Sequence, residues 1–399
     1  MKRLTYNITG ICSAGMVLGI LAGSTAAAQE KNYADLAARI VKTSAQVNPG
    51  DVVVISGGRH NVAVMEELAI QAAKAGGFAT MFLDSDRFER AFYTEVPEKY
   101  LEQEPTFFTE WLKHMTVFIG LPGVEDPKAV FGDVPQERFA KANKASQVVT
   151  DALNASGVRA VFVGYPSKSD AANNQLDFGA YQQTFWDALG ADYQAISATG
   201  NKLKQIFQNA KSVRVTSPSG TDITFSIGNR PVFVDDGIMT PEKAKSHLAL
   251  TRFVSLPGGA VSVAPLETSA NGKVVVARHK CQFQPLLGES FDLKAGHMEN
   301  YKAESGGQCF AEAMAPYQGP KDIFGFLQIG INPAAKVMEN PGDYRPGYAA
   351  GLVTIGIGDN QLMGGNNKVD GGGGFTFPIV NATVTIDGQT VVRDGKLSL

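Results

Sequence analysis

The first regular hydrophobic pattern in the chain runs from Tyr33 to Val47, where the apolar residues fall on one stripe of a helix. Asn48-Pro49-Gly50 would end that helix. The mostly apolar run from Asp51 to Ile55 predicts a short buried strand, and the segment from Asn61 to Ala75 again has one apolar face. The order helix, strand, helix predicts an α/β arrangement.

The same alternation continues along the first half of the chain. Further strands are predicted at 79–83, 116–120 and 159–164, with an amphipathic helix at 136–156. Strands that alternate with helices favour a parallel sheet, so we predict an N-terminal parallel α/β domain. Gly57-Gly58 follows the first strand, but the third glycine of a dinucleotide-binding loop is missing.

The pattern changes near Asp192. Beyond it, short β-branched runs are separated by Pro-Gly or Asn-Gly turn signals. These runs are 213–216, 223–227, 260–264, 273–277, 352–357 and 382–386. They predict a mixed or antiparallel sheet, and hence a C-terminal α+β domain. We place the two domains at residues 29–195 and 196–399.

The N-terminus has the three-part layout of a secretory signal peptide. Met1-Lys2-Arg3 precedes a largely apolar stretch from Ile8 to Gly23, and Ala26-Ala27-Ala28 predicts cleavage after Ala28. Ser24 stands where a lipoprotein signal would have cysteine. No later stretch approaches the roughly 18 apolar residues of a membrane span. We expect a periplasmic or secreted protein that is not held in a membrane after cleavage.

Charge limits the kinds of partner that the protein could bind, and the cysteine count limits its possible disulfides. The formal net charge is −3 and no Lys/Arg run is present, which argues against nucleic acid or an anionic membrane. The partners that this charge allows are small molecules, peptides or proteins. Cys12 leaves with the signal, so Cys281 and Cys309 either form a disulfide or stay as two thiols. A cysteine nucleophile assisted by His279 is less favoured, because a His-x-Cys pattern is common by chance.

Three stretches of the second half carry a resemblance to a known family. They are TSPSGTDITFSIGNRPVFVDDG (Thr216 to Gly237), LPGGAVSVAPLETSANG (Leu256 to Gly272), and GDNQLMGGNN with NATVTIDGQTVVRDGK (Gly358 to Lys396). Together they resemble the aminopeptidase T family of metallopeptidases. The resemblance implies an N-terminal α/β domain, a C-terminal domain with the active site, a homodimer, and two divalent metal ions held by glutamates, histidines and an aspartate.

The residues at the positions implied for those ligands are unsuited to metal. The two glutamates fall on Ala260 and Phe326, the first histidine on Thr354, and the His-x-Asp pair on Gly374 and Thr376. Alanine, phenylalanine and glycine side chains cannot coordinate a hard ion, and hydroxyls are poor substitutes. We therefore predict no metal and no cofactor. The four glycines Gly371 to Gly374 would occupy a place where the family has ligands.

The remaining histidines and carboxylates are the candidates for substitute ligands. His279 and His297 stand eighteen residues apart, a spacing typical of no metal site, and Glu299 lies near them. The others are His60, His114, His247 and Asp370. Surface or hydrogen-bonded roles are favoured for all the histidines.

Two carboxylates could serve as a metal-free acid/base pair. Glu267 and Asp359 lie in stretches that match the family, and proximity in one cleft would separate their pKa values. The structural alternatives are a loop hydrogen bond for Glu267 and a turn with Asn360 for Asp359.

The resulting expectation is an exported aminopeptidase-T-like protein with a degenerate metal site that binds a peptide or other small ligand. Phe326 and Thr354 would line the former metal pocket, and Asn332, Asn360 and Thr376 would also contact the ligand. Two alternatives stay open. One is an active hydrolase of peptide or amide bonds with recruited metal ligands or acid/base residues such as Glu267 and Asp359, and the other is an assembly subunit with an apolar surface.

Overall fold

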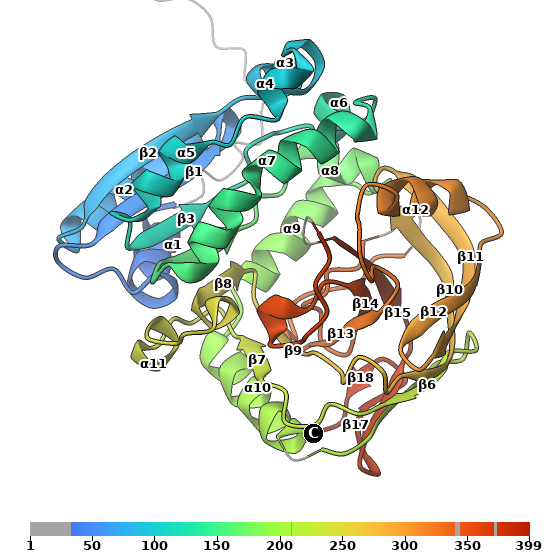
Figure 1. The fold of residues 1–399 in the computed structure, drawn as a ribbon. Helices are drawn as coiled ribbons and strands as arrows, with labels where there is room; N and C mark the ends of the chain where they lie inside the picture. The colour runs from blue at the N-terminus through green and yellow to red at the C-terminus, as the bar shows by residue number, and fades with distance from the viewer. Residues whose placement is uncertain (1–32, 209, 340–343, 371–372) are drawn as a thin grey trace, which may run out of the picture. The chain divides into compact units, whose positions relative to one another are not determined.

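The computed structural model describes residues 33–399 except 209, 340–343 and 371–372. The predicted signal peptide and two of the four glycines, Gly371 and Gly372, lie outside the described residues. The first half of the chain forms the predicted parallel sheet, here called sheet A (Figure 1). Its strand order is β2 (Phe78–Asp84), β1 (Val52–Gly58), β3 (Val117–Gly120), β4 (Arg159–Val163) and β8 (Phe253–Leu256).

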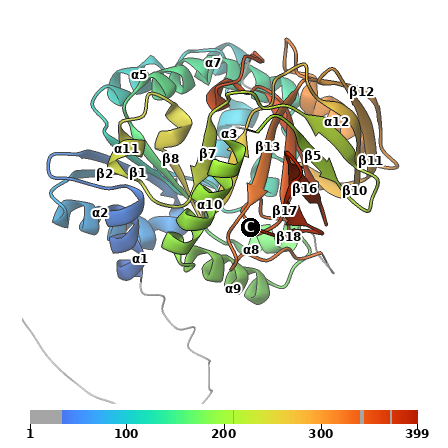
Figure 2. The same cartoon turned by 90° about the horizontal axis from the view of Figure 1, so that it is seen from below.

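Helices cover both faces of sheet A, as the unbroken apolar run in β1 requires. Val53 and Ile55 pack with residues of α1 (Tyr33–Arg39) and α2 (Val62–Lys74). Val54, on the opposite face, packs with residues of α5 (Thr106–Leu112) and α7 (Gln136–Ala155). In Figure 2 the strands lie between these two pairs of helices. The predicted helix from Tyr33 continues past α1 as a π-helical turn, η1 (Ile40–Ser44).

The other helical segments connect the strands. They are η2 (Arg59–Asn61), α3 (Asp86–Glu95), α4 (Glu98–Leu101), α6 (Pro127–Phe131), α8 (Lys168–Asn173), α9 (Phe178–Leu189), α10 (Tyr193–Phe207), α11 (Pro241–Ala244), η3 (Ala249–Arg252), α12 (Gly307–Met314) and η4 (Gln361–Met363). Among the described residues, no helix is both long and apolar enough to cross a bilayer.

Strand β8 comes from the second half of the sequence. It pairs with β4 in parallel register, Val161 beside Val254, and thereby completes sheet A. The predicted domain boundary at residue 195 falls within α10, and residues Tyr33–Leu399 form one compact unit. The two halves of the chain therefore share a sheet.

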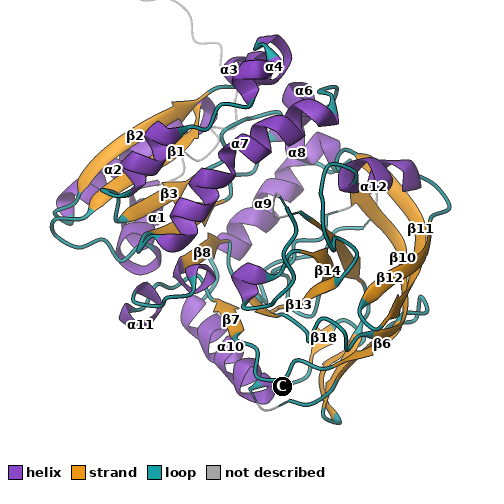
Figure 3. Ribbon diagram, in the orientation of Figure 1, coloured by secondary structure: helices purple, strands orange, loops and turns teal. Residues whose placement is uncertain are grey.

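The second half forms two antiparallel sheets, which confirms the predicted fold class. Sheet B has the strand order β12 (His297–Lys302), β11 (Gln284–Lys294), β10 (Asn271–Cys281), β6 (Asp222–Phe225), β5 (Val213–Thr216), β16 (Thr383–Ile386), β17 (Gln389–Arg393) and β18 (Lys396–Leu397). Sheet C has the order β15 (Gly374–Ile379), β14 (Val353–Gly358), β13 (Phe324–Gly330), β9 (Ala260–Val263) and β7 (Val232–Asp235). Figure 3 shows the long strands of sheet B curving outside those of sheet C.

Aromatic side chains join sheets B and C. Phe225 on β6 meets Phe324 on β13 with ring centroids 4.9 Å apart, and Phe291 on β11 meets Phe377 on β15 at 4.8 Å. Edge-to-face and tilted ring pairs of this kind add to the free energy of apolar burial. The face of sheet C that carries Phe324 and Phe377 therefore packs against sheet B in the core.

A disulfide joins Cys281 at the end of β10 to Cys309 in α12. The sequence left this pairing open, and the structure places the two Cα atoms 6.0 Å apart. A bonded cysteine has no thiolate, so the structure excludes Cys281 as a nucleophile assisted by His279 in this state.

Candidate functional site

Sheet C has one apolar and one polar face because side chains alternate along each strand. Leu327 and Ile329 of β13 point into the core with their partners on β9 and β14. Gln328, between them, lies directly opposite Ser262 on β9 and Thr354 on β14. Ser262 donates from its hydroxyl to Gln328 Oε1 at 3.3 Å. The second face therefore carries Gln328, Ser262 and Thr354, and we call it the polar face.

The five positions implied for the family's metal ligands all lie on this polar face. Residues directly opposite one another in an antiparallel sheet share a face. Phe326 pairs with Gly356, which pairs with Thr376. In neighbouring rows, Thr354 pairs with Gln328, Gly374 with Gly358, and Ala260 with Gly330. The strand register therefore brings together the residues that the resemblance selected from four separate strands.

These residues do not fit a metal ion. Ala260 and Gly374 offer no side-chain donor, Phe326 offers a hydrocarbon ring, and Thr354 and Thr376 offer neutral hydroxyls. The Phe326 ring also lies across Gly356, where an added Cβ would come within 2.1 Å of a ring carbon. Across the part of the chain that the structure describes, no three histidine, cysteine or carboxylate side chains gather in a group that could hold a metal. No chemistry through a metal is derived for this site.

A cavity of about 410 Å³ opens beside the polar face. Its size is within the range of pockets that hold small molecules. Three of the predicted site residues, Phe326, Thr354 and Thr376, line it together with Gln328 and Pro378. The remaining lining residues are Asn174, His279, Lys280, Tyr344, Arg345 and Gly347. The cavity is thus formed by sheet C, the end of β10, the end of α8 and the loop before β14.

His279 lies beside a buried carboxylate in the cavity wall. Its Nδ1 atom lies 3.3 Å from Glu289 Oε2, and the Glu289 side chain is completely buried. Tyr301 donates from its hydroxyl to the other Glu289 oxygen at 3.0 Å. The imidazole also packs edge-on against Phe375.

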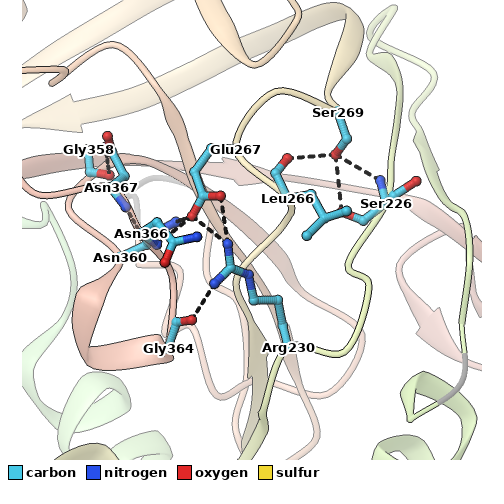
Figure 4. A network of polar contacts seen from close by, with 10 residues as sticks. All are labelled: Ser226, Arg230, Leu266, Glu267, Ser269, Gly358, Asn360, Gly364, Asn366 and Asn367. Carbon is cyan, nitrogen blue, oxygen red and sulfur yellow. Dashed lines mark hydrogen bonds and ion pairs between the residues drawn. The ribbon is translucent and has the colours of Figure 1, made fainter.

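Glu267 belongs to a different polar network, shown in Figure 4. Its carboxylate accepts two hydrogen bonds from Arg230, at 2.8 and 2.6 Å, one from the Asn366 N–H at 2.6 Å, and one from the Asn360 amide at 3.2 Å. Arg230 also donates to the Gly364 carbonyl. The network ties the loop after β9 to the loop after β14.

The environment of Glu267 favours its charged form. Burial alone would raise the pKa of this carboxyl, but the donated hydrogen bonds from the Asn366 backbone and the Asn360 amide, together with the Arg230 charge, outweigh burial and lower the pKa. A general acid would need the opposite shift. Glu267 is not among the described residues that line the cavity.

Asp359 has the turn geometry that was the alternative to catalysis. One carboxylate oxygen accepts from the Gln361 N–H at 3.1 Å, and the other accepts from the Val369 N–H at 2.9 Å. Asn360 is buried, donates to Glu267 and accepts from the Asn367 N–H at 2.8 Å. The structure brings Asn360 to Glu267 but leaves both outside the cavity lining.

Asn332 is also buried among backbone groups. Its amide donates to the carbonyls of Ala188 at 3.0 Å and Gly258 at 2.8 Å, and its oxygen accepts from the Ala334 N–H at 3.0 Å. These bonds hold the end of β13 to α9 and to the loop before β9. The side chain is fully enclosed, so its surroundings are those of a structural residue.

The Asn332→Ala variant should be less stable than the wild type by about 2 kcal/mol, because it removes the buried amide that donates to the Ala188 and Gly258 carbonyls. Thr376→Val, at an exposed position on β15, should change stability by less than about 0.5 kcal/mol. Urea unfolding followed by circular dichroism measures both. Equal effects of the two substitutions would contradict the structural role of Asn332.

Sequence reasoning missed the cationic part of the cavity. The sequence did not point to Lys280 or Arg345, and for His279 it favoured a surface or hydrogen-bonded role over that of a metal ligand or a partner of Cys281. His279 and Lys280 come from β10, in a different sheet from the polar face. The one available signal was the run of consecutive basic residues, Arg278-His279-Lys280, at the end of β10.

Comparison with known proteins identifies the family. A sequence profile described as thermophilic metalloprotease (M29) matches residues 27–323. Among curated proteins, none matches this chain. The structure resembles wild-type AmpT from Thermus thermophilus, with a TM-score of 0.72 and 16% identity, covering 92% of this chain and 99% of that one.

A second solved structure has the same fold. It is 2,5-dihydroxypyridine dioxygenase from Pseudomonas putida KT2440, with a TM-score of 0.60 and 13% identity, covering 92% of this chain and 96% of that chain. At these identities the two likenesses establish the fold alone. The profile match, by contrast, extends over most of the chain and confirms the resemblance seen in the sequence. The chain belongs to the thermophilic metalloprotease (M29) family, as a divergent member that lacks the expected metal ligands.

Proposed function

We propose that this protein binds a peptide or other small ligand, without a metal ion, in the cavity beside the polar face of sheet C. One observation carries the proposal. The strand register gathers the five positions implied for metal ligands on one face, their side chains suit no metal, and a cavity of about 410 Å³ is still present there. A scaffold that keeps the cavity without the metal ligands can still bind a small molecule.

The location and assembly of the protein are part of the same proposal. The signal-like N-terminus supports export to the periplasm or the medium. The family resemblance supports a homodimer. The edge strand β2 exposes the apolar side chains Phe78, Met81 and Leu83, which a partner could cover. Fractionation of cells and sedimentation of the purified protein test these two points.

A second candidate function, hydrolysis of a peptide or amide bond, is favoured by His279. The imidazole lines the cavity beside the Glu289 carboxylate, and an imidazole is the side chain that most often serves as a general base. Glu267 and Asp359, the earlier candidates for this chemistry, are held by loop hydrogen bonds instead.

Elemental mass spectrometry of the protein purified without chelator is the experiment that tests the proposal. We expect zinc, cobalt, manganese and iron each to be far below one atom per chain, because the gathered side chains are poor ligands. We also expect a thermal-shift screen of peptides and organic acids to raise the melting temperature, since a ligand that binds only the folded state stabilises it.

Near-stoichiometric metal together with metal-dependent peptidase activity would overturn the proposal. Release of amino acids from peptides by the metal-free protein, lost in His279→Gln, would support the hydrolase instead. Binding without turnover would favour the first candidate.

A further inference from the structure

The outer edge of sheet A carries most of the exposed apolar side chains of the protein. Twelve large hydrophobic side chains of the described residues are exposed, and eight of them lie between residues 70 and 108. On the edge strand β2 these are Phe78, Met81 and Leu83, with exposed fractions of 69%, 47% and 55%. Apolar side chains gathered in this way mark an interaction surface.

The apolar surface continues from β2 onto α5. Phe82 of β2 packs on Trp111 with ring centroids 4.3 Å apart, and Phe108 lies beside Trp111 at 6.3 Å. Phe107 and Phe108 are themselves exposed. The exposed side chains of β2 and α5 together present on the order of 500 Å². Two copies of this surface would bury about 1,000 Å², which is the area that a specific interface needs.

The β2 strand has none of the sequence features that usually protect an edge strand. Such strands avoid pairing through lysine, proline or a β-bulge. The residues from Phe78 to Leu83 include no charged residue and no proline, and their register with β1 is continuous. No described strand pairs with the outer side of β2, which is the outermost strand of sheet A in Figure 1. An edge of this kind is a template for a strand of another chain.

The backbone groups on the outer side of β2 follow from its hydrogen bonds. The Phe78 N–H donates to the Asp51 carbonyl, on the side of β1. Successive residues of a strand point their N–H and C=O groups to opposite sides, so those of Ala79, Met81 and Leu83 point outward. In an antiparallel pair, such residues lie opposite one another and exchange both hydrogen bonds.

A second copy of β2 fits these outward groups. When Met81 lies on a twofold axis, it pairs with its own counterpart and Ala79 pairs with Leu83, so every outward N–H meets a carbonyl. No like charges meet, because the strand has none between Phe78 and Leu83. We propose that two copies of this chain associate through antiparallel pairing of their β2 strands, which joins the two A sheets into one. This inference rests on the homodimer in the proposed function, because it names the surface that forms it.

Sedimentation velocity of the purified protein over a range of concentrations tests the inference. We expect the wild type to form a dimer. Met81→Lys places two lysines opposite each other across the axis, so it should raise the dimer dissociation constant about a hundredfold. Leu362→Lys is the matched control, because Leu362 is 40% exposed but lies in η4. That variant should associate as the wild type does.

Cysteine cross-linking tests the register. Hydrogen-bonded residues of an antiparallel pair have Cα atoms about 5.5 Å apart, which is within the range for a disulfide. Met81→Cys should therefore form a covalent dimer under mild oxidation, visible on a denaturing gel without reductant. Thr80→Cys, which lies opposite Phe82 of the other copy, should cross-link about tenfold more slowly. Lys273→Cys, at an exposed position on β10, measures cross-linking by random collision.

The outcomes separate this inference from the proposed function. A wild type that is monomeric at every concentration would overturn the inference and the homodimer together. A dimer that persists in Met81→Lys, or a Met81→Cys variant that cross-links no faster than the two cysteine controls, would overturn the inference and leave the homodimer to another surface. Circular dichroism checks the fold of every variant, and Leu83→Lys replaces Met81→Lys if the latter does not fold. Ligand binding in the cavity is tested independently of all these results.

Discussion

Replacing Glu267 with glutamine should lower the free energy of unfolding by about 3 kcal/mol. The carboxylate is bound by Arg230, Asn360 and the Asn366 N–H, and the Glu267 and Arg230 side chains are only 19% and 11% exposed. Removing one charge leaves the other buried without its partner, which costs more than the pair itself contributes. Urea unfolding of the variant and the wild type, followed by circular dichroism, measures the difference.

An exposed ion pair provides the matched control. Arg214 and Asp222 pair at 2.7 Å with side chains 58% and 53% exposed, so Asp222→Asn should cost less than about 1 kcal/mol. A loss of stability in Glu267→Gln no larger than in Asp222→Asn would contradict the network in Figure 4.

The pKa of Glu267 predicts the pH at which its stabilising effect disappears. The folded protein holds this pKa below its unfolded value, so the contribution is complete above the unfolded pKa and is lost as pH falls through the folded pKa. The difference in stability between the wild type and Glu267→Gln should therefore shrink on acidification, which unfolding at a series of pH values below neutrality would show.

The disulfide between Cys281 and Cys309 should have an effect of similar size. The bond closes a loop with a sequence separation of 28 residues, and the chain-entropy estimate for such a loop is about 3.5 kcal/mol. The Cys281→Ala/Cys309→Ala double variant should lose this stability. The wild type in excess reductant should lose a similar amount.

The comparison of oxidised and reduced protein decides this prediction. Reductant should lower the midpoint of unfolding in the wild type and leave the double variant unchanged. A wild type that does not respond to reductant would show that the two sulfurs are not bonded in solution, or that the bond does not restrain the unfolded chain.

Much of the fold follows from local pattern. The apolar run of β1 and the one-sided apolar face of α2 identify the parallel layer, and the β-branched runs of the second half identify antiparallel sheets. The pattern did not place β8, because a run of four residues carries no signal for a partner strand about ninety positions earlier, even with Pro257-Gly258 marking its end. The change in hydrophobic pattern near Asp192 coincides with the start of α10. Asp192 is the N-cap of this helix and accepts from the Gln194 and Ala195 N–H groups.

The sequence predicted only those site residues that lie in or beside the family motifs. The resemblance selected Phe326, Thr354 and Thr376, and sheet register explains why they meet. Asn332 and Asn360 stand beside the same motifs, but their amides are used by backbone groups and by Glu267. Lys280 and Arg345 lie far apart in the sequence, and only tertiary packing brings them to one cavity.

The origin of β8 also bears on how the chain acquires its structure during synthesis. The fifth strand of sheet A ends at Leu256, so a nascent chain that has produced only the first four strands leaves the edge of β4 unpaired. An unpaired edge is a template for association with other chains. A fragment cut at residue 195 should therefore aggregate, whereas one extended beyond Leu256 supplies the missing strand. Sheet A can be completed only after nearly two thirds of the polypeptide has left the ribosome.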